Sequence, residues 1–270
     1  MKTTIKTMET VTKINNKLTK TLKIKDKILS VYFTAGYPEL YDTTKLVLIL
    51  QEAGADMIEI GIPFSDSLLD GPVIQDSNNK ALNNGMTLKL LLQELLTIKD
   101  QIRIPLVLMG SYNSAFRLGM ETFCKACKEC GIDGVLFPEM PPEEFQEDYL
   151  EMYEANNLSS IFMVSPQTSE ERLKFIDEVT TGFIYVLSSN STTGSNDKTE
   201  FKNSYFEKIR DQKLQSPTLT GFNIRTKENF DMACKYTQGA IIGSEFIRLI
   251  SNGVEQDQIK NFIEKYKKAE

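Results

Sequence analysis

Residues 28–62 read ILSVYFTAGYPELYDTTKLVLILQEAGADMIEIGI and contain a complete strand–helix–strand unit. The runs Ile28–Thr34 and Met57–Ile62 are short, apolar and rich in β-branched residues, which is typical of buried strands. Between them, Thr43–Ala53 carries apolar residues at helical spacing. Two strands joined by a helix predict parallel pairing through a right-handed crossover.

The same alternation continues along the rest of the chain. Six further apolar runs bring the candidate strands to eight: Leu106–Met109, Gly134–Phe137, Ser160–Val164, Phe183–Leu187, Thr218–Phe222 and Ala240–Ile242. Helical periodicity separates them, at Leu88–Gln101, Glu143–Ala155, Ser169–Val179 and Lys227–Tyr236. Because no break in composition divides these units, the sequence predicts an α/β fold, a single (β/α)8 TIM barrel domain over residues 1–270. The alternative is an open, doubly wound sheet.

Two segments are additions to this plan. Lys13–Lys27 precedes the first strand and predicts an N-terminal helix that covers the bottom of the barrel. Gly71–Asn84 adds a helical piece, so the loop after the second strand is long, and long ordered loops at this position usually carry function. Thr168, three residues before Glu171, predicts a capping box for the helix that follows.

The composition excludes several classes of partner. The 270 residues are 41% hydrophobic, and the net charge of −6 comes with both signs mixed along the chain, so we expect no nucleic acid and no membrane partner. No run approaches the roughly 18 apolar residues of a membrane span. Met1–Lys20 lacks the apolar middle of a secretory signal, so we expect a cytoplasmic protein.

Histidine is absent and cysteine is sparse. Three of the four cysteines, Cys124, Cys127 and Cys130, fall near one face of a predicted helix, which suits either a metal site or a buried core. We favour the core, because Cys234 is distant and no histidine completes a site. Without histidine, acid–base chemistry must use carboxylates, lysine, tyrosine or cysteine.

Active sites of such barrels lie at the carboxyl ends of the strands. Glu59 sits in the otherwise apolar second strand, where burial should raise its pKa and suit it to proton transfer; the alternative is a structural glutamate paired with a basic group. Asp70 follows eleven residues later, before Gly71 and Pro72, at a turn that could swing over the barrel mouth or serve only as a turn.

The seventh and eighth strands suggest an anion site. They end in Gly221–Asn223 and Ile242–Ser244, at the corner where many barrels bind phosphate, and Gly194 after the sixth strand could complete the site. An ordinary aldol cleavage would need a Schiff-base lysine or a metal to hold the electrons of the broken carbon–carbon bond. No strand end presents a lysine, and histidine ligands are absent. The substrate itself must therefore take up these electrons, as an indole ring does once it is protonated at carbon. We therefore expect a phosphorylated substrate, no metal and no cofactor.

Six motifs occur in the order and spacing of one known family. They are Phe33–Pro38 (FTAGYP), Glu59–Asp66 (EIGIPFSD), Asp70–Pro72 (DGP), Pro138–Pro142 (PEMPP), Pro166–Arg172 (PQTSEER) and Ile242–Ser244 (IGS). Over nearly its whole length the sequence resembles the tryptophan synthase α subunit family. The resemblance implies reversible cleavage of indole-3-glycerol phosphate to indole and glyceraldehyde 3-phosphate. It also implies a β subunit that holds pyridoxal phosphate, within an αββα heterotetramer.

The resemblance also assigns roles to individual positions. Glu59 matches the family's general acid–base, Asp70 the carboxylate that binds the indole N–H, and Tyr185 a tyrosine near the glutamate. The remaining matches are substrate-binding: Tyr32 and Phe222 as apolar walls of the indole pocket, Thr193 as the residue that positions Asp70, and Gly194, Gly243 and Ser244 at the phosphate.

Some positions depart from the family pattern, and they cluster around the expected site. Ser67 and Leu69 replace proline and alanine beside Asp70, and Asn223 replaces a glycine in the phosphate corner, where its side chain could obstruct the backbone but tolerates positive φ. Further changes are Ser111 and Ser114 for tyrosine and proline, Glu139 for aspartate, and Ser191 and Thr192 for glycine and valine.

These departures leave alternative functions open. One is a non-catalytic barrel that only activates a β subunit, and another is a lyase that releases indole without a partner. An unrelated phosphate-binding isomerase is disfavoured, because the spacing of Glu59 and Asp70 and the motif around them would then be a coincidence.

Overall fold

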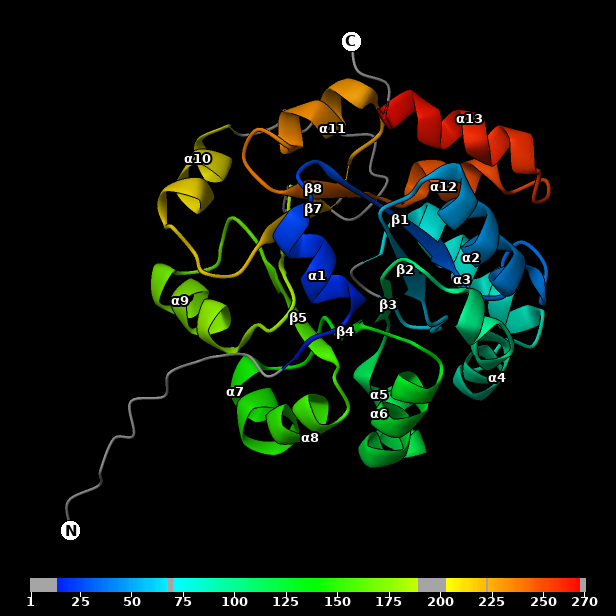
Figure 1. The fold of residues 1–270 in the computed structure, drawn as a ribbon, viewed down its shortest axis with the longest axis horizontal. Helices are drawn as coiled ribbons and strands as arrows, with labels where there is room; N and C mark the ends of the chain where they lie inside the picture. The colour runs from blue at the N-terminus through cyan, green and yellow to red at the C-terminus, as the bar shows by residue number, and fades with distance from the viewer. Residues whose placement is uncertain (1–13, 68–69, 189–202, 222, 268–270) are drawn as a thin grey trace.

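The computed structural model describes residues 14–67, 70–188, 203–221 and 223–267. Within them, eight parallel strands close into a barrel in sequence order, and β1 pairs with both β2 and β8 (Figure 1). The strands are β1 (Ile28–Thr34), β2 (Met57–Gly61), β3 (Leu106–Met109), β4 (Gly134–Leu136), β5 (Ser159–Val164), β6 (Ile184–Leu187), β7 (Thr218–Gly221) and β8 (Gly239–Ile242). The predicted TIM barrel is confirmed, and the open sheet is excluded.

Helices surround the barrel between successive strands (Figure 1). They are α2 (Asp42–Ala53), α3 (Pro72–Asn83), α4 (Leu88–Ile98) with the 3-10 turn η1 (Lys99–Gln101), α5 (Tyr112–Leu118), α6 (Met120–Glu129), α7 (Pro142–Glu144), the π-helical η2 (Phe145–Tyr149), α8 (Leu150–Ala155), α9 (Glu170–Val179), α10 (Asn203–Asp211), α11 (Lys227–Ala233), α12 (Ser244–Leu249) and α13 (Gln256–Lys267). All strand residues of β1 and β2 are buried, as expected of a sheet with a filled interior and a helical cover. The single-domain prediction includes ranges outside the described residues and stays a prediction.

One helix cap differs from the prediction. The N-cap of α9 is Ser169, whose Oγ accepts the backbone N–H of Arg172 at 3.1 Å. Thr168 does not cap the helix, because its hydroxyl accepts the N–H of Ser165 at 3.0 Å in the preceding turn. The capping-box prediction was therefore wrong by one residue.

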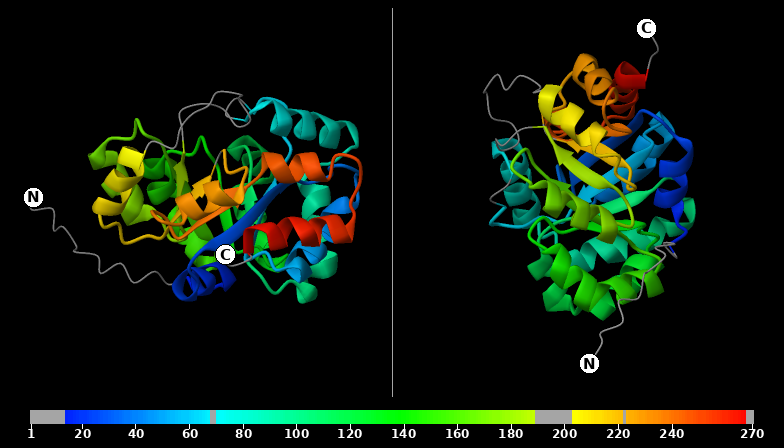
Figure 2. Two further views of the ribbon diagram at one scale, coloured as in Figure 1. Left: turned by 90° about the horizontal axis from the view of Figure 1, so that it is seen from above. Right: turned by 90° about the vertical axis from the view of Figure 1, so that its left-hand side faces the viewer.

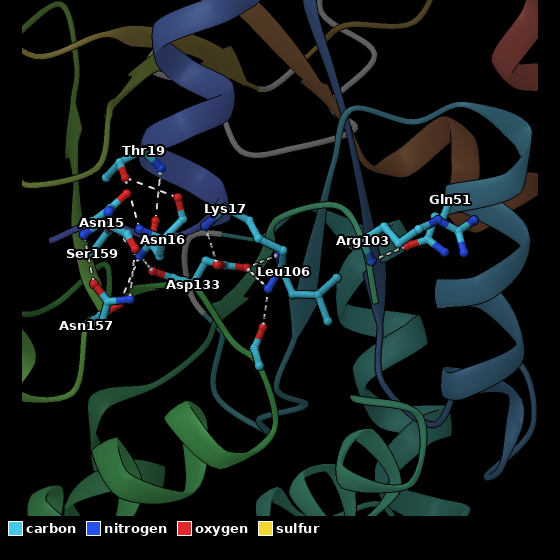
Figure 3. Close-up of polar contacts among 11 residues, drawn as sticks. Asn15, Asn16, Lys17, Thr19, Gln51, Arg103, Leu106, Asp133, Asn157 and Ser159 are labelled. Carbon is cyan, nitrogen blue, oxygen red and sulfur yellow. Dashed lines mark hydrogen bonds and ion pairs between the residues drawn. The ribbon is translucent and has the colours of Figure 1, made fainter. Parts of the chain in front are cut away.

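The extra N-terminal helix α1 (Lys17–Ile24) lies across the end of the barrel where the strands begin (Figures 1 and 2). Asn16 caps it and also donates its amide to the carbonyl of Asp133 at 2.7 Å and to Ser159 Oγ at 3.1 Å (Figure 3). Lys17 Nζ lies 2.9 Å from Asp133 Oδ2. These contacts fasten the helix to β4 and β5, so α1 seals the bottom, as predicted for the longer range Lys13–Lys27.

The long segment after β2 lies at the opposite end. Helix α3 is an addition between β2 and α4, and it sits on the side of the barrel away from α1 (Figure 2). Pro72 at its first position supplies a favourable φ without a lost hydrogen bond. The predicted long loop is confirmed, and it delivers Asp70 and Ser67 to the carboxyl ends of the strands.

The cysteine run belongs to the core. Cys124 and Cys127 lie on α6, Cys130 is its C-cap, and all three side chains are buried. Burial raises the pKa of Cys124 to about 12, so the thiol stays protonated and inert.

Among the described residues, no helix has the length and apolar character that a membrane crossing requires.

Candidate active site

A cavity opens at the carboxyl ends of the strands, opposite α1. It gathers side chains from β1, β2 and β6 and from the loops after β2, β7 and β8. Seven of the predicted site residues line it together: Tyr32, Glu59, Asp70, Tyr185, Asn223, Gly243 and Ser244.

Glu59 lies in the middle of β2, opposite Tyr32 of β1 and Val107 of β3. Its side chain is 1% exposed, and neither carboxyl oxygen has a hydrogen-bond partner within the described ranges. Burial, with a smaller contribution from the nearby charge of Asp70, raises the pKa of Glu59 to about 8. At neutral pH the group is a buried neutral acid, so the structural alternative of an ion-paired glutamate is not what the described residues display.

Asp70 enters the same cavity from the loop between β2 and α3. Burial raises the pKa of Asp70 to about 6, even though hydrogen bonds from Ser67 and Asn78 oppose the rise. The amide of Asn78 donates to Asp70 Oδ2 at 3.3 Å and to Ser67 Oγ at 3.1 Å, and Gln75 donates to the Asp70 carbonyl at 2.8 Å. Asp70 is thus held at both its backbone and its side chain, and it is the more easily ionised of the two carboxyls.

Tyr32 lines the cavity together with the two carboxyls and carries a hydroxyl, where we had expected only an apolar wall. Its ring lies against β2 because Gly61 leaves room: a Cβ at Gly61 would stand 2.1 Å from the tyrosine oxygen. Burial raises the pKa of Tyr32 well above its usual range, and the charges of Asp70 and Glu59 raise it further. The phenol therefore stays protonated and can donate a hydrogen bond in the cavity.

Tyr185 on β6 occupies a matching position across the barrel. A Cβ at Gly221 would lie 1.9 Å from its hydroxyl oxygen, so glycine at the end of β7 is required for this ring. Burial raises the pKa of Tyr185, and the charges of Glu59 and Asp70 raise it further, so the phenol stays protonated.

The loops after β7 and β8 bring the residues of the predicted anion corner to the cavity. Asn223 adopts φ 56°, the left-handed conformation that a glycine would take without strain. Gly243 and Ser244 begin α12, and a Cβ at Gly243 would stand 3.3 Å from the Tyr32 ring. Arg225 also lines the cavity, beside Asn223 and Ser244.

A second lobe of about 350 Å³ adjoins the first and shares Tyr32, Asp70 and Met109 with it. Ser111 lines this lobe and donates to Glu139 at 2.7 Å. Ser114 lines a different cavity, so only the first of the two serine substitutions bears directly on the space beside Asp70.

Sequence reasoning missed Arg225 and Asn78. Asn78 is in the interior of α3 and 3% exposed, and Arg225 directly precedes the N-cap Thr226 of α11. A signal for Asn78 was present, since a polar residue on the apolar face of an amphipathic helix requires a partner. Phe222, Thr193 and Gly194 lie outside the described residues, as do Leu69, Ser191 and Thr192.

Two carboxyls of unequal acidity that line one cavity, Glu59 buried and Asp70 half-buried, suit a reaction in which one group delivers a proton while the other stabilises positive charge. At a pH between the two pKa values, Asp70 is ionised and Glu59 is protonated. On the other side of the cavity, the Arg225 guanidinium and the backbone at Gly243 and Ser244 suit a negatively charged group on the same substrate.

Comparison with known proteins agrees with this geometry. The sequence model of the family "Tryptophan synthase alpha chain" matches residues 18–270. The tryptophan synthase alpha chain of Flavobacterium psychrophilum is 47% identical over 241 residues, which cover 88% of this chain and 95% of the relative. That of Christiangramia forsetii is 46% identical over 254 residues, 93% and 98% of the two chains.

Solved structures give the same answer. The tryptophan synthase A-subunit of the hyperthermophile Pyrococcus furiosus superposes with a TM-score of 0.80 at 32% identity, over 90% of this chain and 98% of that one. With a family model that matches most of its length and relatives close to half identical, this chain belongs to the tryptophan synthase α chain family.

Proposed function

We propose that Glu59 and Asp70 are the catalytic carboxylates of this chain, acting as the α subunit of a tryptophan synthase. The family cleaves indole-3-glycerol phosphate to indole and glyceraldehyde 3-phosphate, a carbon–carbon lyase reaction. One observation carries the assignment: Glu59 is fully buried at the floor of the cavity with a pKa of about 8, beside a second carboxyl of lower pKa.

The proposed steps follow from these protonation states. Neutral Glu59 donates its proton to the indole carbon that bears the glycerol chain, and the ring becomes a cation. Asp70 accepts a hydrogen bond from the indole N–H and stabilises that cation. The Glu59 carboxylate then takes the proton from the glycerol hydroxyl next to the ring. The carbon–carbon bond breaks as the aldehyde forms, its electrons return to the ring, and Glu59 is neutral again.

The other predicted site residues bind and orient the substrate. Tyr185 and Tyr32 flank Glu59, and their protonated hydroxyls orient the reacting groups. Asn223, Gly243 and Ser244 form the corner that receives the phosphate, through backbone N–H groups. Phe222, Thr193 and Gly194 complete the site by their family positions alone.

The family pairs with a β subunit, and we propose that this chain does so in an αββα heterotetramer. The described lining of the second lobe includes Asp70 and Ser111 but not Asn223, Gly243 or Ser244 of the phosphate corner. At about 350 Å³ it is large enough for indole to leave the site without passing back through that corner. A cytoplasmic location and a single domain stay predictions of the sequence.

The test is release of indole from indole-3-glycerol phosphate, with and without a purified tryptophan synthase β subunit. The chain has no tryptophan, so its own fluorescence does not obscure the signal of indole. We expect slow release by the chain alone and a large increase with the β subunit. High release that ignores the β subunit would favour the stand-alone lyase, and no release under either condition by a folded protein would favour a purely activating barrel.

A further inference from the structure

We infer that Arg225 is a direct ligand of the substrate phosphate, and that Asn223 orients its guanidinium. This inference rests on the proposed function, because it names the charged group that holds the phosphate in the same cavity. Arg225, Asn223 and Ser244 line one corner of that cavity, while Glu59 and Asp70 line the other side.

The balance of charge in the cavity requires a cation there. The described lining residues include three acids, Glu59, Asp70 and Glu245, and one base, Arg225. Glu245 is paired with Arg248 on α12, so its charge is already opposed. A phosphate dianion that leaves water for a cavity with two further carboxyls needs a compensating charge. A guanidinium provides it with two parallel N–H donors, which match two phosphate oxygens.

The backbone of Arg225 is fixed from two directions. Its N–H donates to Asn229 Oδ1 at 3.3 Å, within the capping box of α11, and its carbonyl accepts the hydroxyl of Tyr266 at 2.9 Å. Tyr266 belongs to α13 and is 2% exposed. The side chain therefore starts from a rigid point between α11 and α13, so that little order has to be gained when the phosphate binds.

Asn223 links the arginine to the phosphate corner. It holds φ 56°, and its Oδ1 accepts from Arg225 Nη2 at 3.5 Å. The family pattern has a glycine at this position, so asparagine preserves the left-handed backbone and adds an acceptor for the arginine. The two residues act as one device, in which the side chain that replaces glycine orients the cation.

The experiment compares Arg225→Ala with Lys227→Ala in the full chain. Lys227 is a matched control, because it carries the same charge two residues away and is paired with Asp231 at 2.6 Å outside the cavity. Calorimetric titration with glycerol 3-phosphate measures the site directly and requires no turnover. We expect Kd to rise about 10- to 100-fold in Arg225→Ala, the usual effect of losing charge-assisted bonds, and to stay unchanged in Lys227→Ala.

Cleavage assays separate phosphate binding from a structural role. For indole-3-glycerol phosphate, KM should rise by a similar factor in Arg225→Ala with little change in kcat. For indole-3-glycerol without the phosphate, kcat/KM should match that of the unaltered chain. An unchanged Kd for glycerol 3-phosphate, or an equal loss on both substrates, would overturn the role of Arg225.

A second variant tests the link to Asn223 without removing the charge. Asn223→Gly keeps the backbone conformation but releases the guanidinium, so we expect Kd for glycerol 3-phosphate to rise about two- to fivefold, as for one weak hydrogen bond. An equal or lower Kd would overturn the orienting role of Asn223. Because the titration is independent of cleavage, absence of indole release would count against the proposed function and leave these binding results to decide on Arg225.

Discussion

Asp56 directly precedes β2 and Glu59 lies in the middle of that strand, three residues later, and their environments are opposite. Asp56, at the bottom of the barrel, contacts Lys25 at 2.6 Å and Lys267 at 2.8 Å and accepts the N–H of Leu29 at 3.0 Å. Burial alone would raise the pKa of Asp56, but these donors together lower it. Glu59 has no such partners among the described residues, and its pKa rises to about 8.

The difference separates carboxylates that stabilise the barrel from the two that we propose as catalytic. At the bottom, Asp56 ties α1, β1 and α13 together, and Asp133 does the same for α1 and β3 through Lys17 and the N–H of Leu106. At the top, Glu59 and Asp70 line the same cavity. The unpaired carboxyls at the top cost the fold free energy. The barrel can tolerate this cost at the end where substrates of such barrels bind, because the carboxylates at the opposite end have ion-pair and hydrogen-bond partners.

Of the substitutions that test this contrast, Glu59→Gln should have the largest effect, a loss of cleavage activity. The amide preserves shape but neither donates an acidic proton nor accepts one, so cleavage should fall by about 10³- to 10⁴-fold, the upper range for one general acid–base group. Steady-state indole release measures the loss, and circular dichroism checks the fold. Turnover within tenfold of the unaltered chain would remove Glu59 from the mechanism.

The same variant should change how stability depends on pH. The pKa of Glu59 is raised in the folded state, so the folded protein binds the proton more tightly, and stability declines as pH rises from about 4.5 towards 8. Between pH 5 and 8, the free energy of unfolding should fall by about 2 to 4 kcal/mol more in the unaltered chain than in Glu59→Gln. Urea denaturation at several pH values measures this, and parallel pH curves would contradict the raised pKa.

Asp56→Asn should produce the complementary result. Loss of the charge weakens three hydrogen bonds at a 6% exposed carboxyl, while both lysines can turn to water, so unfolding should become easier by about 1.5 to 3 kcal/mol. The pKa of Asp56 is lowered by folding, so this difference is present above about pH 4 and disappears as pH falls through the folded-state value.

Urea denaturation of Asp56→Asn, with Asp100→Asn at an exposed position of η1 as the control, measures the effect. The kcat for indole release should stay the same in both variants, because neither residue lines the cavity. A loss of activity in Asp56→Asn without a loss of stability would show that Asp56, below β2, is coupled to the cavity.

The sequence predicts the barrel well because its strands are local features. Each predicted strand end lies within one residue of the observed one. Short apolar runs between helical segments are compatible with few structures other than buried strands. Glu59 was recognisable for the same reason: a charge within an apolar strand is costly unless it is used. Helix bounds were less accurate, and α1 is shorter than predicted because Asn16 caps it.

The contributions of Tyr32, Asn78 and Arg225 depend on contacts that no local pattern contains. The Tyr32 hydroxyl has room in the cavity only because Gly61, on the next strand, lacks a side chain. Arg225 owes its position to Tyr266, which is 41 residues further along the chain. Such residues become visible only when the closed barrel brings distant segments to one end.

Asn78→Ala should give the smallest change and tests how Asp70 is held. Productive chemistry needs Asp70 ionised and Glu59 protonated, so the pH profile of kcat/KM should be bell-shaped, with limbs near 6 and 8. Removal of the amide takes away a hydrogen bond that lowers the pKa of Asp70, so the acidic limb should move to higher pH and the bell should narrow. At pH 6.5 we expect a loss of about tenfold, as for one hydrogen bond to a charged group.

Asn79→Ala on the exposed side of α3 is the control, and its profile should match that of the unaltered chain. A uniform loss in Asn78→Ala, with both limbs unmoved, would mean that Asn78 only packs the loop after β2. A shift of the acidic limb alone would show that α3 sets the acidity of Asp70. At the top of the barrel, the pKa of Asp70 would then be set by a hydrogen bond from the added helix α3. At the bottom, the pKa of Asp56 is lowered by lysines from α1 and α13.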